Sequence, residues 1–78
     1  MSTTIAPTTL DLREYASPLP VVKTAQAIRT MPPGELIEVL ATDPASVADF
    51  RSWCRATGNH LIAWSREDGV FSFLIRRR

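Results

Sequence analysis

The sequence predicts an α/β fold, a two-layer α/β sandwich in which two helices cover one face of a mixed four-stranded sheet, in the order βαβαββ. Two helix-start patterns, Ser-Pro-Leu-Pro at residues 17–20 and Thr-Asp-Pro at 42–44, each follow a strand-like segment. An Asp-Gly pair at residues 68–69 separates the last two strand-like segments and predicts a hairpin. A strand-helix-strand unit favours parallel pairing with a right-handed crossover, and a hairpin is antiparallel, so the sheet should be mixed.

Length and composition indicate one small globular domain. The chain has 78 residues, of which 45% are hydrophobic and 22% charged, and we expect a flexible tail at 1–8 and a domain at 9–78. The formal net charge of +1 gives no reason to expect nonspecific binding of nucleic acid. No apolar run approaches the roughly 20 residues that span a membrane, and the N-terminus lacks the pattern of a signal peptide. The single cysteine excludes an internal disulfide, so we expect a cytoplasmic protein without metal or cofactor.

The first strand is predicted around residues 10–13, where leucines alternate with charged residues. Ser17 suits the N-cap of the first helix, because its hydroxyl can accept from a free amide of the first turn. Pro18 would then occupy N1 and Pro20 N3, where a missing amide removes a donor that would otherwise be unpaired. Ser17 should therefore lie among free N–H groups at the positive end of the helix dipole, which suits an anion.

The first helix should run from residue 18 to about residue 31, with apolar residues 18, 21, 25 and 28 forming its buried stripe. Leu19 and Lys23 fall on the opposite side of this helix. Leu19 is thus an exposed apolar residue beside the helix start.

The second half of the chain continues this alternation. Residues 35–41 are nearly all apolar, which is typical of a strand in the middle of a sheet. Asp43 is expected at the N-cap and Pro44 at N1 of a second helix that ends near Gly58. Cys54 shares one face of that helix with two apolar residues, so its thiol should be buried and unreactive.

The last two strands are expected at residues 59–65 and 70–77. If Trp64 lies on the open face of the sheet with Leu36 and Leu40, the three form an apolar patch. Such a patch would favour a weak homodimer or the docking of a partner.

The chain resembles the TusA/SirA-like sulfur-carrier family over about residues 9 to 77. The family signature is Leu-Asp-x-Arg-Gly followed by Cys-Pro-x-Pro. The matching segments here are Leu-Asp-Leu-Arg at 10–13, Ser-Pro-Leu-Pro at 17–20, Asp-Pro at 43–44, Gly-Asn-His-Leu at 58–61 and Phe-Leu-Ile-Arg at 73–76. The resemblance implies a fold like the C-terminal domain of translation initiation factor three. It also implies a carrier that takes persulfide sulfur from a cysteine desulfurase or rhodanese-like donor protein and passes it to a sulfur acceptor protein, for tRNA thiolation, cofactor synthesis or sulfur oxidation.

Two positions depart from the family pattern. Ser17 stands where the family has its nucleophilic Cys, and Glu14 stands where it has Gly. Oxygen forms no persulfide and a serine hydroxyl stays protonated, so the covalent step should be blocked. Ser17 reflects either an introduced Cys→Ser change or natural divergence, and Glu14 favours divergence. The resemblance marks Ser17 as the catalytic position, with the following residues in its support or in partner binding: Asp11, Arg13, Pro18, Pro20, Leu19 and Lys23.

Several alternatives remain beside the blocked sulfur carrier. Nothing in the spacing supports a hydrolase built on Ser17 and His60, or a metal site at His60. The arginines Arg76, Arg77 and Arg78 are either solvated or contact an acidic partner or RNA. The second hypothesis is a diverged, non-transferring interaction or regulatory module, and the third is an RNA-binding domain.

Overall fold

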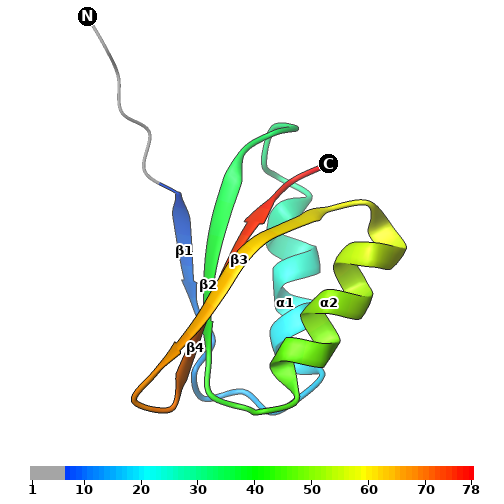
Figure 1. The fold of residues 1–78 in the computed structure, drawn as a ribbon. Coiled ribbons are helices and arrows are strands. Elements are labelled where there is room, and N and C mark those ends of the chain that lie inside the picture. The colour runs from blue at the N-terminus through cyan, green and yellow to red at the C-terminus, as the bar shows by residue number, and fades with distance from the viewer. Residues whose placement is uncertain (1–6) are drawn as a thin grey trace, which may run out of the picture.

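The computed structural model describes residues 7–78, which form one mixed sheet and two helices (Figure 1). Its elements in chain order are β1 (Thr8–Asp11), α1 (Leu19–Ile28), β2 (Leu36–Ala41), α2 (Ser46–Thr57), β3 (His60–Glu67) and β4 (Val70–Arg76). The sheet has the order β1-β2-β4-β3, in which β1 and β2 are parallel and the other two contacts are antiparallel. Both helices lie on the same face of the sheet, so the predicted two-layer fold is confirmed. Residues 1–6 of the predicted tail lie outside the described residues.

The strand β2 lies in the middle of the sheet, as its apolar sequence predicts. Ile37, Val39 and Ala41 are fully buried beneath the helices. The alternate residues, among them Leu36 and Leu40, are only half-buried, because no second layer covers the open face. No helix within residues 7–78 is long and apolar enough to cross a membrane.

The β3–β4 hairpin turns at Asp68 and Gly69, whose φ angles of 51° and 76° are those of a two-residue turn of type I′. A bulge shifts the register between Leu61 and Ala63, so that Trp64 pairs with Phe73. Phe73 is fully buried in the core, so Trp64 lies on the helix side of the sheet. The expected place of Trp64 on the open face is therefore wrong, because one extra residue in a strand moves all later side chains to the other face.

The core lies between the helices and the sheet. Phe50 of α2 and Phe73 of β4 are fully buried, with ring centroids 4.6 Å apart. In α1 the buried residues are Pro20, Thr24 and Ile28. Of the predicted stripe, Ile28 is therefore confirmed, residues 21 and 25 are half-buried, and residue 18 is exposed because it precedes the helix. The Thr24 hydroxyl donates to the Pro20 carbonyl at 2.8 Å, which satisfies its polar group inside the core.

Candidate functional site

Ser17 lies in the loop between β1 and α1, at the end of the molecule where α2 begins (Figure 1). The helix α1 starts at Leu19, with Pro18 at the N-cap position, and no side chain caps it. The prediction that Ser17 is the N-cap is therefore wrong, as are the placements of Pro18 at N1 and of Pro20 at N3, because Pro20 is at N2. The Ser17 hydroxyl accepts from no amide of the helix, and it donates to a carboxylate.

The first turn of α1 offers no free amide to an anion. The Leu19 N–H donates to the Ala16 carbonyl at 2.9 Å, and the amides of residues 21 and 22 donate to the Pro18 carbonyl at 3.1 and 3.2 Å. Pro20 has no N–H to give. The expected cluster of free donors around Ser17 is thus absent from the described structure, and only the helix dipole remains to attract negative charge.

Two carboxylates hold Ser17 instead. The Ser17 N–H donates to Oδ2 of Asp43 at 2.8 Å, and the Ser17 hydroxyl donates to Oδ2 of Asp49. Asp43 also accepts from the Ala45 N–H at 2.9 Å. These two main-chain donors, Ser17 first, hold the pKa of the Asp43 carboxyl below its usual range. Residue 17 is therefore a double hydrogen-bond donor in an acidic setting.

Asp43 and Asp49 both belong to the start of α2. This helix begins at Ser46 after the N-cap residue Ala45, so the prediction of Asp43 as N-cap and Pro44 as N1 is wrong by two residues. Asp49, in the first turn of α2, was not predicted from the sequence as a residue of the site. An acidic residue in a first helical turn is a recognisable dipole partner, but its contact with a residue 32 positions earlier is set by tertiary structure.

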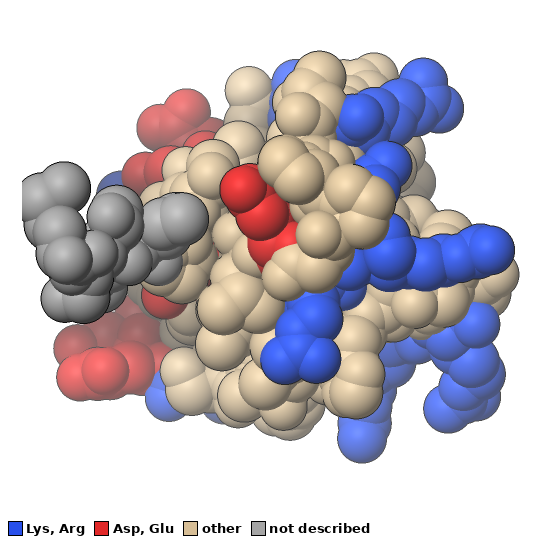
Figure 2. Space-filling view, turned by 90° about the horizontal axis from the view of Figure 1, so that it is seen from above, with Lys and Arg blue, Asp and Glu red and all other residues tan. Residues whose placement is uncertain are grey.

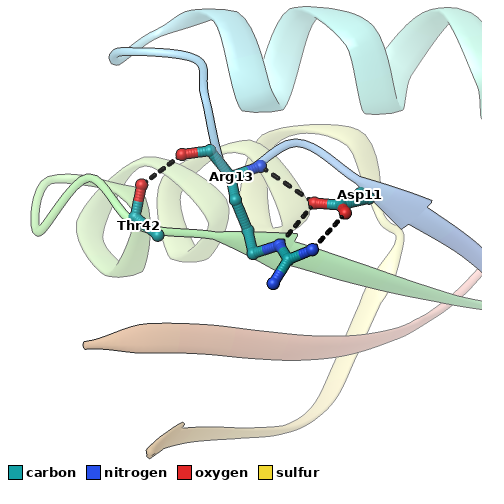
Figure 3. A network of polar contacts seen from close by, with 3 residues as sticks. All are labelled: Asp11, Arg13 and Thr42. Carbon is teal, nitrogen blue, oxygen red and sulfur yellow. Dashed lines mark hydrogen bonds and ion pairs between the residues drawn. The ribbon is translucent and has the colours of Figure 1, made fainter. Parts of the chain in front are cut away.

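Asp11 and Arg13 form the one ion pair within residues 7–78 (Figure 3). Nη2 and Nε of Arg13 donate to the two carboxylate oxygens of Asp11 at 2.7 and 2.8 Å, in a bidentate arrangement. The hydrogen bonds lower the pKa of Asp11 and raise that of Arg13. The Arg13 carbonyl accepts from the Thr42 hydroxyl, which ties the loop of Ser17 to the loop before α2.

A groove of about 550 Å³ lies beside this ion pair, and Glu14 lines it. The other lining residues are Asp11, Arg13, Tyr15, Thr42 and Val70. No group of three or more His, Cys, Asp or Glu side chains within residues 7–78 is arranged to hold a metal ion.

A surface patch at the start of α1, which we call the α1 patch, comprises Tyr15 of the preceding loop and Leu19, Val22 and the half-buried Lys23 of the helix. Leu19 and Val22 are 44% and 43% exposed, and Tyr15 is 38% exposed. The Lys23 ammonium lies 4.6 Å from the centroid of the Tyr15 ring, in a cation–π contact. The residues expected to bind partners, Leu19 and Lys23, therefore lie together and accessible next to the loop of Ser17.

Neither Cys54 nor His60 joins this site. Cys54 is buried on the inner face of α2, and burial raises the pKa of its thiol to about 11. His60 begins β3 just after the end of α2, whereas Ser17 contacts the beginning of α2. A 12-residue helix spans about 18 Å, so His60 and Ser17 are not neighbours.

Comparisons with known proteins agree with this fold. The model of the family described as "Sulfurtransferase TusA" matches residues 8–77. The sulfur carrier protein TusA of Allochromatium vinosum is 38% identical over 68 residues, which cover 87% of this chain and 90% of that protein. The sulfur carrier protein TusA of Pseudomonas syringae pv. syringae is 38% identical over 69 residues, covering 88% and 82%. The crystal structure of a SirA-like protein from Desulfitobacterium hafniense superposes with a TM-score of 0.77 at 20% identity, over 88% of this chain and 95% of that chain, and so shares the fold.

Proposed function

Since the chain belongs to the sulfurtransferase TusA family, we propose that it docks on the sulfur-transfer proteins that such carriers serve but does not itself carry sulfur at residue 17. The observation that carries this proposal is the pair of hydrogen bonds from Ser17 to the carboxylates of Asp43 and Asp49. A hydroxyl forms no persulfide, and a carboxylate is too weak a base to activate it as a nucleophile. Cys54 does not take over the role, because its thiol is buried and protonated.

The two carboxylates beside Ser17 favour a module that does not transfer sulfur over a carrier that is changed only by the replacement of its cysteine with serine. A persulfide at residue 17 would be an anion, and it would meet two carboxylates and an α1 first turn whose amides are already bonded. Like charges at such short range disfavour the ionised form. Replacing the serine by cysteine should therefore restore only part of the chemistry.

The α1 patch supports retained docking. It places exposed apolar side chains and one cation on both sides of Ser17 along the chain. Apolar side chains grouped on a small domain often mark a protein-binding surface. The partners in this proposal are a cysteine desulfurase or rhodanese-like donor and a downstream sulfur acceptor, in the cytoplasm.

Intact-mass spectrometry tests the sulfur-transfer half of the proposal. The Cys54→Ala chain is incubated with a purified cysteine desulfurase and L-cysteine, and should gain no adduct of about 32 Da. The matched Ser17→Cys, Cys54→Ala chain should gain a partial one. A full adduct on the chain that keeps Ser17 would contradict the proposal.

A competition experiment tests the docking half. The unlabelled chain should displace a fluorescent TusA carrier from the same desulfurase, and Leu19→Asp should weaken this displacement about tenfold, as expected for an apolar contact residue. Ile62→Asp, at a similarly exposed position on β3, is the control and should change the displacement less than twofold. Equal weakening by both variants would place docking elsewhere.

A further inference from the structure

A second pocket lies at the end of the helix layer opposite to Ser17. Its volume is about 350 Å³, and its lining residues are Ile28, Arg29, Thr57, Asn59, Arg77 and Arg78. The pocket therefore sits where α1 and α2 end, while Ser17 sits where they begin. Three of its six lining residues are arginines, and no acidic side chain lines it.

Two of these arginines are held against the helix ends. Nε of Arg77 donates to the Ile28 carbonyl at 2.8 Å, at the last residue of α1. Nη1 of Arg78 approaches the Thr57 carbonyl at 3.4 Å, at the last residue of α2, and the Arg78 main-chain N–H donates to Asn59 at 2.8 Å. The arginines expected either in solvent or on a partner thus fold back onto the domain, which fixes their guanidinium groups in place.

The two helix C-termini neutralise only part of the positive charge of the three arginines and accept from only some of their N–H groups. Each helix C-terminus carries about half a negative charge, so two of them offset about one of the three arginine charges. Each guanidinium has five N–H donors. Arg77 directs two of them to carbonyl oxygens and Arg78 one, while the Arg29 side chain has no hydrogen bond or ion pair within residues 7–78. The pocket therefore keeps a net positive charge and most of its donors.

The neighbouring carboxylate does not neutralise this charge. Glu35 is joined to Arg77 through the main chain, with the Arg77 N–H donating to the Glu35 carbonyl at 2.8 Å. Its side chain does not line the pocket and forms no ion pair in the described part of the chain.

Charge is also separated across the whole molecule. Seen from this end, Lys and Arg side chains gather over the helix layer, and most of the Asp and Glu side chains in view lie on the sheet side (Figure 2). On the open face of the sheet, Glu38, Glu67 and Asp68 line one shallow depression. The formal net charge is only +1, so the molecule is a dipole rather than a polycation.

This distribution favours an acidic protein segment over nucleic acid as the ligand. A long polyanion would be repelled by the acidic sheet face, and nonspecific binding of nucleic acid rests on many basic contacts. The pocket also lacks the aromatic side chains on which single-stranded bases stack. Guanidinium groups pair well with carboxylates, and a pocket of this size accommodates one or two of them.

We propose that the pocket of Arg29, Arg77 and Arg78 is a second docking site, which binds Glu or Asp side chains of a partner protein. It lies at the opposite end of the helices from the α1 patch, so two partners can be bound at once. The proposal concerns residues far from Ser17, so variants of Ser17 should leave it unchanged, and its failure would not bear on the sulfur-transfer proposal.

Fluorescence anisotropy with a labelled hexaglutamate peptide at low salt tests this site on the full chain. Arg29→Gln should weaken binding about fivefold, and Arg29→Gln with Arg78→Gln about twentyfold, because charge-assisted hydrogen bonds are lost. Arg66→Gln, near the hairpin, removes the same charge outside the pocket and should change affinity less than twofold. The Arg29 side chain makes no hydrogen bond or ion pair within residues 7–78, and the main-chain N–H of Arg29 is unaffected by the substitution, so its replacement should leave the melting temperature unchanged.

Three results would overturn the proposal. The first is absence of any binding of hexaglutamate to the parent chain. The second is equal weakening by Arg29→Gln and Arg66→Gln, which would show nonspecific attraction. The third is tighter binding of a single-stranded RNA 20-mer than of the peptide, with the same dependence on Arg29, which would make the site a phosphate site of nucleic acid.

Discussion

Charged side chains complement the helix dipoles at both ends of the helix layer, but only at one end does part of that charge remain unpaired. At the Ser17 end, Asp43 and Asp49 lie at the start of α2, where negative charge is favourable. At the other end, Arg77 and Arg78 contact the last carbonyls of α1 and α2, where positive charge is favourable.

The difference lies in what remains unpaired. The carboxylates accept from Ser17 and Ala45, and the first amides of α1 are bonded, so the Ser17 end is closed to an incoming anion. The arginines give few of their donors to the helix ends, so the opposite end is open to one. Residue 17 is thus held by structural hydrogen bonds, whereas at the other end of the helices side-chain donors of the arginines remain without partners among the described residues.

The largest effect should come from the core that both ends share. Phe50 is fully buried beneath α2 against Phe73, so Phe50→Ala should lower the free energy of unfolding by about 3–5 kcal/mol. Urea unfolding measures this, with Phe50→Leu as a milder variant if the Ala chain does not fold. Arg51→Ala, the exposed neighbour, should change stability by less than about 0.5 kcal/mol. A loss below that of Arg51→Ala would show that the two ends do not depend on this core.

The pKa and reactivity of a cysteine at residue 17 measure how strongly the Ser17 end disfavours an anion. In a Cys54→Ala background, the Ser17→Cys thiol should have a pKa above that of a free cysteine, because Asp49 contacts the side chain of residue 17 and Asp43 contacts its main-chain N–H. Adding Asp49→Asn should increase its alkylation rate by iodoacetamide at pH 7.5 about tenfold. Glu14→Gln removes a nearby carboxylate that is not bonded to residue 17, and should have a smaller effect. A thiol pKa below the free value with Asp49 intact would mean that the helix dipole outweighs the carboxylates.

The fold could be predicted because its signals are local. Alternation along 10–13, the apolar run 35–41 and the Asp-Gly turn each report on a few adjacent residues, and chain connectivity then leaves few ways to build the sheet. Trp64 shows where this fails. Its side depends on a bulge at residue 62, and nothing in the alternation of the strand announces an extra residue.

The candidate site was harder to predict for a related reason. The Ser-Pro-Leu-Pro pattern correctly indicates a helix start, but the role of Ser17 is decided by two carboxylates that lie 26 and 32 residues further along the chain. The Ser17 hydroxyl donates to the carboxylate of Asp49, and it accepts from no amide of α1 because the helix begins one residue later than predicted. In the same way, the sequence of three consecutive arginines is compatible with a solvated tail, and only the folded structure brings two of them to the ends of α1 and α2.

Substitution of Gly58 tests whether the contact with Arg78 affects peptide binding apart from its effect on backbone strain. Its φ of 78° is in the left-handed region at the end of α2, and an added Cβ would lie 3.1 Å from Cδ of Arg78. Gly58→Ala should lower the free energy of unfolding by about 1 kcal/mol and weaken hexaglutamate binding, because Arg78 must move. Gly69→Ala in the β3–β4 hairpin is the matched control, since its φ is 76° and its Cβ would meet nothing within 4 Å. It should lower the free energy of unfolding by a similar amount and leave peptide binding unchanged. Equal losses of peptide binding in the two variants would show that Arg78 does not contribute to the pocket.

The smallest effect is the response of the Ser17 end to acid, and its sign follows from Asp43. The N–H groups of Ser17 and Ala45 lower the pKa of this carboxyl in the folded chain. Its contribution to stability is therefore complete above the ordinary carboxyl pKa of about 3.9, and is lost as the pH falls through the lower folded value. Urea midpoints measured from pH 5 down to pH 2 should fall less steeply for Asp43→Asn than for the parent. Asp68→Asn at the hairpin tip, where asparagine tolerates the positive φ, should keep the parent slope. If Asp43→Asn and Asp68→Asn show the same slope, the carboxylate of Asp43 does not hold the loop of Ser17 in place.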